Sequence, residues 1–116
     1  MQITVNTDNH IHGGVELTHR VEAVIEDSLG RFGERITRVE VHLSDENSRQ
    51  KSGDEDKRCV IEARLAGLQP IIVSDEGSSA AQALDGAADK LVKILDRTLG
   101  RLDDPKGRMS YAGDQT

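Results

Sequence analysis

The sequence predicts one two-layer α+β domain whose strands and helices follow the order β-α-β-β-β-α. Two observations lead to this prediction. Apolar residues recur at every second position in four short stretches, which is typical of strands with one buried face. In two longer stretches they recur every three or four positions, which is typical of amphipathic helices. A sheet and two helices of this kind bury one another when both helices cover the same face, so we expect a four-stranded mixed sheet with both helices on one face.

The composition restricts what this domain can bind. The chain has 116 residues, enough for one domain with a modest core, and 31% of them are charged. Because the formal net charge is -6, a uniformly basic surface is excluded, and any contact with RNA has to come from a local patch. Phe32 and Tyr111 are the only aromatic residues, which excludes the stacking platforms of single-strand-binding proteins. We therefore expect no reading of base sequence.

Cysteine content and hydropathy bear on the compartment. Cys59 is the only cysteine, so an intramolecular disulfide is excluded. We find no signal peptide and no apolar run long enough to span a bilayer. We therefore expect a cytoplasmic protein with no membrane partner.

The first strand is predicted from Ile3 and Val5, which alternate with polar residues. Residues 8–14 then break the pattern. This segment contains His10 and His12, whose spacing could suit a metal ion, but no nearby cysteine or carboxylate pattern completes a set of ligands. We therefore expect no metal site.

The first helix is predicted from residue 15 to about residue 31. Gly30 and Gly33 loosen its end, and its acidic residues outnumber its basic ones. Its apolar positions recur at spacings of three and four: Leu17, Val21, Val24, Ile25, Leu29 and Phe32.

Three more strands follow. The second begins at Ile36 and the third covers residues 58–65, with a polar loop between them. The fourth covers residues 70–74, where Pro70 favours an edge strand or the start of a strand. The inward-facing residues of the second and third strands are predicted to be Val39, Val41, Leu43, Cys59, Ile61, Ala63 and Leu65.

Neither Cys59 nor His42 suggests a catalytic role. His42 falls on the polar face of its strand, whereas Cys59 falls on the apolar face of the next one. No further group is positioned by the sequence to activate or orient such a pair. We expect no catalytic residue and no cofactor.

The longest periodic stretch, residues 78–102, predicts a helix whose charges are sorted by sign. Either Ser78 or Ser79 can cap its first turn. Its apolar face comprises Leu84, Ala87, Ala88, Leu91, Ile94, Leu95, Thr98, Leu99 and Leu102. A basic stripe, defined as Lys90, Lys93, Arg97 and Arg101, runs beside an acidic band, defined as Asp85, Asp89, Asp96 and Asp103. The stripe is either an ordinary solvated surface or a docking surface for a polyanion such as RNA.

The order of the elements also predicts strand directions. The first two strands are joined through a helix, so they are parallel if they are neighbours, and the later strands turn back antiparallel. Residues 1–103 form the expected domain, and residues 104–116 form an expected disordered tail.

Several stretches resemble the ribosome hibernation-promoting factor family, also called ribosome-associated inhibitors. Residues 56–64 resemble an acidic branch of that family. The other stretches that carry the resemblance are Met1-Gln2-Ile3-Thr4-Val5, Arg35-Ile36, the Val39-Val41-Leu43 strand, and Leu84-Asp85 followed by Asp89-Lys90-Leu91.

The resemblance implies a non-enzymatic role in translation. Members of this family bind the small ribosomal subunit where messenger and transfer RNA lie, and so hold ribosomes inactive in starvation or cold. They contact rRNA through basic residues on both helices. The implied RNA-binding residues here form a positive ridge and are Lys90, Lys93, Arg97, Arg101, Arg20 and Arg31. The chain resembles the short form of the family, without the dimerising C-terminal domain.

A protein-interaction module on the same fold is the alternative function. It would use the acidic loop of residues 45–56, or the exposed face of the sheet, to bind a protein partner. A second copy of the chain is one such partner, so a homodimer stays open.

Overall fold

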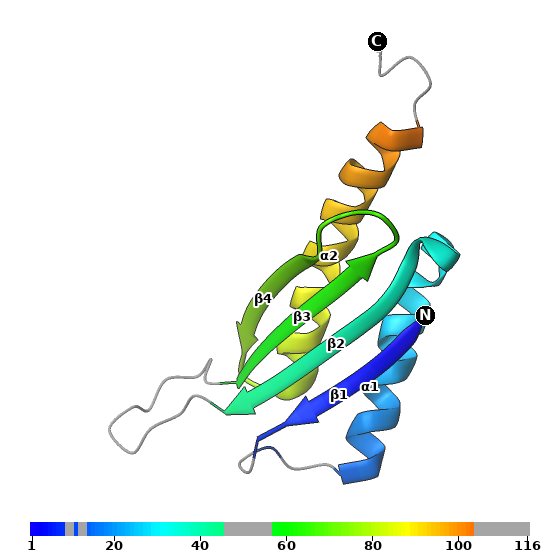
Figure 1. Ribbon diagram of the computed structural model, residues 1–116. Coiled ribbons are helices and arrows are strands. Elements are labelled where there is room, and N and C mark those ends of the chain that lie inside the picture. The colour runs from blue at the N-terminus through cyan, green and yellow to red at the C-terminus, as the bar shows by residue number, and fades with distance from the viewer. Residues whose placement is uncertain (9–10, 12–13, 46–56, 104–116) are drawn as a thin grey trace.

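The computed structural model describes residues 1–8, 11, 14–45 and 57–103, and the predicted order of elements is confirmed (Figure 1). His10, His12, most of the loop of residues 45–57, and the tail of residues 104–116 lie outside the described residues. The elements are β1 (Gln2–Thr7), α1 (Gly14–Leu29), the 3-10 helix η1 (Gly30–Arg35), β2 (Ile36–Asp45), β3 (Lys57–Leu65), β4 (Ile71–Gly77) and α2 (Ala80–Asp103).

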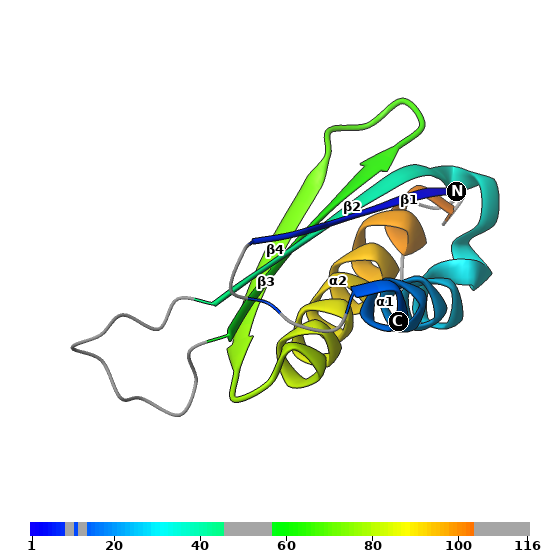
Figure 2. The same cartoon turned by 90° about the horizontal axis from the view of Figure 1, so that it is seen from below.

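The four strands form one sheet in the order β1-β2-β3-β4, and both helices cover the same face of it (Figure 2). β1 is parallel to β2, whereas β3 is antiparallel to both β2 and β4. α2 packs mainly on β3 and β4, and α1 lies beside it. The predicted fold class and strand directions are therefore confirmed, and β4 is an edge strand, as Pro70 suggested.

The core lies between the sheet and the two helices. The inward-facing residues predicted for β2 and β3 are all buried, and α1 contributes Val21, Ile25 and Leu29. The apolar face of α2 is buried at Leu84, Leu91 and Leu95, among others. Burying one such side chain contributes about 1.5–3 kcal/mol, so this contact between α2 and the sheet is a major source of stability. No helix in the described part of the chain is long and apolar enough to cross a membrane.

The boundary between β4 and α2 differs from the prediction. β4 continues through residues 75–77, because Cys59, Arg58 and Lys57 of β3 pair with them across the sheet. α2 consequently begins at Ala80. The Ser79 hydroxyl accepts a hydrogen bond from the Gln82 amide at 3.1 Å, so Ser79 is the cap of this helix.

β4 and α2 approach each other through bare backbone at Gly77. A methyl group at this position would lie 2.8 Å from Cβ of Gln82 and 2.9 Å from the amide nitrogen of Ala83. Gly100, in contrast, lies within α2 and would place the same methyl group in open space. Packing thus requires glycine at position 77 but not at position 100.

We expect Gly77→Ala to lower the free energy of unfolding by about 1–3 kcal/mol, because the helix backbone cannot move away cheaply. Gly100→Ala should instead raise it by up to about 1 kcal/mol, because alanine is the better helix former. Urea unfolding of both variants measures the difference. Equal stabilities would contradict the tight approach at Gly77.

Candidate nucleic-acid interface

The exposed surface of α2 has two flanks of opposite charge on either side of its buried face. All four residues of the basic stripe are exposed, as are Asp85, Asp89 and Asp96 of the acidic band. The two flanks face different elements of the fold, so their charged side chains have different partners.

The basic flank faces β4, and Lys90 makes the contact. Its ammonium group donates a hydrogen bond to the Ser74 carbonyl at 2.9 Å and lies 3.4 Å from a carboxylate oxygen of Asp75. The Asp75 carboxylate lies against Gly86 of α2, where there is no room for a β-carbon. Gly86 therefore lets Asp75 reach between the strand and the helix, and Asp75 in turn helps to fix Lys90.

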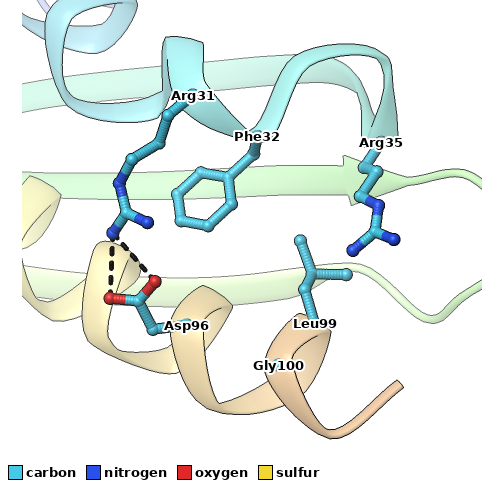
Figure 3. A pocket seen from close by; sticks show the side chains of 6 residues that line it. All are labelled: Arg31, Phe32, Arg35, Asp96, Leu99 and Gly100. Atoms are coloured by element: carbon cyan, nitrogen blue, oxygen red, sulfur yellow. Dashed lines mark hydrogen bonds and ion pairs between the residues drawn. The ribbon is translucent and has the colours of Figure 1, made fainter. Parts of the chain in front are cut away.

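The acidic flank faces α1 and η1, and Asp96 makes the contact. One terminal nitrogen of Arg31 lies 2.8 Å and 2.9 Å from the two Asp96 carboxylate oxygens (Figure 3). This hydrogen bond raises the pKa of the Arg31 guanidinium. The same guanidinium lies over the Phe32 ring, 4.4 Å from its centroid. Arg31 is thus separated from the basic stripe by the acidic band, and the two do not join into the expected continuous ridge.

The remaining cations of the stripe differ in their partners. Lys93 lies 3.1 Å from Asp89 one turn earlier, and both side chains are well exposed. Such a pair contributes only about 0.2–0.5 kcal/mol, so a phosphate group can replace the aspartate at little cost. Arg97 and Arg101 form no ion pair with any residue that the structure describes. These two arginines are the most available cations of α2.

Arg20 is exposed on α1, and it too has no ion pair among residues 1–8, 11, 14–45 and 57–103. The six cations predicted to contact RNA therefore have unequal surroundings. Lys90, Lys93 and Arg31 each form an ion pair with an aspartate, whereas Arg97, Arg101 and Arg20 form none with the described residues.

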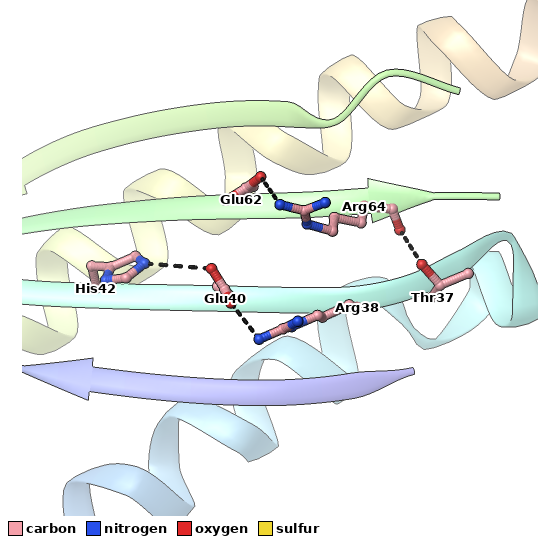
Figure 4. A network of polar contacts seen from close by, with 6 residues as sticks. All are labelled: Thr37, Arg38, Glu40, His42, Glu62 and Arg64. Atoms are coloured by element: carbon pink, nitrogen blue, oxygen red, sulfur yellow. Dashed lines mark hydrogen bonds and ion pairs between the residues drawn. The ribbon is translucent and has the colours of Figure 1, made fainter. Parts of the chain in front are cut away.

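The outer face of the sheet carries a second set of charges, which the sequence analysis did not single out (Figure 4). Arg38 pairs with Glu40 at 2.6 Å along β2, and Arg64 pairs with Glu62 at 3.3 Å along β3. His42 lies 3.8 Å from Glu40. The alternation of the strands does place these residues on one face, but only the structure gives their pairing. These ion pairs offset the positive charges of Arg38 and Arg64.

Cys59 and His42 lie on opposite faces of the sheet, so they cannot act as a pair. Cys59 is buried against the helices, whereas His42 is exposed on the outer face. Burial and the charge of Asp75 raise the pKa of the Cys59 thiol from 9.0 to about 12. No group of three or more metal-ligating side chains occurs among the residues that the structure describes.

Comparison with known proteins gives the family. Residues 9–103 match the family model described as sigma 54 modulation protein / S30EA ribosomal protein. The chain belongs to this family. No curated protein sequence matches the chain of this S30EA family member.

Solved structures share the fold of this S30EA family member. A ribosomal subunit interface protein from Coxiella burnetii superposes with a TM-score of 0.62 at 14% identity, covering 86% of this chain and 99% of that one. The N-terminal domain of Protein Y from Thermus thermophilus superposes with a TM-score of 0.58 at 24% identity, covering 84% and 99% of the two chains. At these identities the likeness concerns the fold.

We expect the Cys59 thiol to resist Ellman's reagent at pH 8 in the folded protein and to react fully after unfolding, since it is buried and its pKa is about 12. The folded state raises this pKa, so the stability linked to the thiol is intact below about pH 9 and declines as the pH rises toward 12. Cys59→Ala should remove that part of the decline. Rapid labelling at pH 8 without unfolding would contradict the assignment.

Proposed function

We propose that this protein is a ribosome-associated translation inhibitor that binds rRNA of the small subunit under stress and holds ribosomes inactive. The family description, which names a ribosomal protein, supports the ribosome as the partner. The similar Coxiella burnetii structure, which is titled a ribosomal subunit interface protein, points in the same direction. The proposal places the protein in the cytoplasm with the ribosome.

The exposed basic stripe on α2 is the observation that carries this proposal. Lys93, Arg97 and Arg101 follow one another at intervals of four residues, which corresponds to about 6 Å along a helix. A row of cations with this spacing can follow a phosphate backbone, and Arg97 and Arg101 need not leave an acidic partner among the described residues to do so. Lys90 would have to leave the Ser74 carbonyl, so we rank its contribution lower.

The phosphate contacts make the expected binding strongly dependent on salt, because each of them releases counterions from the RNA. Each phosphate contact lowers the slope of log affinity against log salt by about 0.7–0.9. Four to six contacts give a slope of about -3 to -5. The acidic remainder of the protein opposes non-specific binding to other nucleic acids, because it repels phosphates that the stripe does not meet.

Inhibition in this proposal requires only occupancy. The domain would fill space that messenger or transfer RNA needs, and no covalent bond would be made or broken. The cations contribute binding and orientation, and the rigid packing of α2 on the sheet keeps the stripe straight.

A protein-interaction module is the second candidate, and the outer face of the sheet favours it. Ile72 on edge strand β4 is 64% exposed, and it lies across the sheet from Glu62. An exposed isoleucine beside ordered ion pairs suits a protein surface better than an RNA backbone.

Co-sedimentation with small ribosomal subunits over a salt series tests the first candidate. The wild type should pellet at low salt and be released as salt rises, and the pair Lys93→Glu with Arg97→Glu should abolish pelleting. Arg97→Glu should weaken binding far more than Arg64→Glu, which makes the same charge change on the outer sheet face. A wild type that stays in the supernatant at every salt concentration would overturn the proposal, and equal effects of the two single variants would overturn the assignment to α2.

Asp89→Asn provides a gain-of-function test. Removing this carboxylate releases Lys93 and removes a negative charge near the RNA, so affinity for small subunits should rise roughly 2- to 5-fold. Glu62→Gln makes the same charge change on the other face and should leave affinity unchanged. If Asp89→Asn weakens binding, the acidic band contributes to recognition and the stripe is not the interface.

A further inference from the structure

A small cavity lies between η1 and the C-terminal half of α2. Its volume is about 280 Å³, and its lining residues are Arg31, Phe32, Arg35, Asp96, Leu99 and Gly100 (Figure 3). This volume is just below the range of roughly 300–1,000 Å³ that is usual for drug-sized ligands, so the cavity suits one small ring system. Except for Arg31, none of these residues was assigned an RNA contact above.

The Arg31 side chain is fixed in place although it is 57% exposed. Asp96 accepts its hydrogen bond from one side, and the Phe32 ring lies beneath the guanidinium. A long side chain normally loses rotamer freedom when it binds a ligand, and this one is already ordered. A guanidinium plane held in this way is a surface on which a nucleobase can stack.

The floor of the cavity is apolar and its rim is charged. Phe32 is partly buried against the core, and Leu99 is 5% exposed. Arg31 and Arg35 carry positive charges at the rim, and Asp96 carries one negative charge. Phe32 is the only Phe, Tyr or Trp among the described residues, so the cavity offers one stacking position and not a platform.

Gly100 gives an independent reason to regard the cavity as a binding site. It lies inside α2, where glycine is about 1 kcal/mol less favourable than alanine, and no neighbouring atom lies within 4 Å of where its β-carbon would be. Packing therefore does not require glycine here. It does border the cavity, and a larger side chain would narrow the opening.

We propose that this cavity receives one unstacked nucleobase of the bound RNA, which stacks on the Arg31 guanidinium above Phe32. The inference rests on the proposed function, which it deepens. Asp96 retains lone pairs that can accept hydrogen bonds from the exocyclic amino group of adenine or cytosine, or from the N–H groups of guanine.

A nucleobase fits the charges of this cavity better than a phosphate group does. Arg31 is already paired with Asp96, and the carboxylate would repel a phosphate placed beside it. A neutral aromatic ring needs no free cation and gains from stacking on the guanidinium. Since one stacking position reads no sequence, the site would add affinity without selecting an RNA sequence.

Gly100→Leu tests the proposal by placing a large side chain beside the cavity, and Gly100→Ala is the matched smaller substitution. Binding to small subunits is measured for both across a salt series. Gly100→Leu should weaken binding roughly 5- to 150-fold, the usual range for losing one stacked base, while the slope against log salt stays unchanged. Gly100→Ala adds only one methyl group at the same position, so it should weaken binding far less than Gly100→Leu does. Phe32→Leu, a second variant whose folding is checked by circular dichroism, should weaken binding in the same manner.

Other outcomes overturn the inference. Wild-type affinity in Gly100→Leu means that the cavity is not used. If the slope of log affinity against log salt becomes shallower by about one in Gly100→Leu, a phosphate and not a base occupies the cavity. A free nucleotide is the ligand if two results occur together. Free adenosine monophosphate changes the chemical shifts of residues 31–35 and 96–100, and Gly100→Leu binds small subunits as the wild type does.

A wild type that fails to bind small subunits at any salt concentration defeats the proposed function, and the cavity is then judged by a separate measurement. A short single-stranded oligoribonucleotide is titrated against the wild type and against Gly100→Leu by NMR. Chemical-shift changes confined to residues 31–35 and 96–100 in the wild type, and lost in the variant, support the nucleobase site. No shifts in either protein overturn it.

Discussion

The burial of the apolar face of α2 against β3 and β4 is the contact on which the rest of the structure depends. It fixes the rotation of α2 about its own axis, and the rotation decides which charged flank meets which neighbour. A change of one residue in that rotation, about 100°, would take Lys90 from the edge of β4 and Asp96 from Arg31. The free energy of this packing is many times that of the exposed ion pairs, so the packing positions the charges, and the charges do not position the helix.

The fold was predictable from sequence because it follows from periodicity and element order. Alternation in β2 and β3 identified their buried residues, and Pro70, which favoured an edge strand or the start of a strand, directly precedes edge strand β4. The partners of the cations were not predictable, because they come from distant positions: Arg31 and Asp96 are 65 residues apart, and Lys90 and Asp75 are 15 apart. The positions of residues around a single helix show that acidic and basic side chains lie on different sides. They do not show which other elements those sides face. The cavity was hidden for the same reason, since it exists only where η1 meets α2.

In the proposed function, local arrangement and not total charge would provide the surface of this acidic domain that binds RNA. The six cations predicted to bind RNA fall into two groups, one ion-paired with aspartates and one without an ion pair among the described residues. The pairs are solvent-exposed and weak, so they can exchange an aspartate for a phosphate when the local concentration of phosphate is high. The arginines near the C-terminal end of α2 need no such exchange, and they lie near the end of the helix that borders the cavity.

Lys90 also has a consequence for self-association. Among the strands that the structure describes, β4 pairs only with β3, so its other side is an edge of the sheet to which another chain could hydrogen-bond. The Lys90 ammonium occupies the Ser74 carbonyl of this strand and brings a positive charge to it. A lysine at the edge of an unpaired strand opposes the addition of another strand. The added strand would have to displace the ammonium group and bury the charge of the lysine. The same side chain that belongs to the basic stripe therefore keeps the sheet four strands wide.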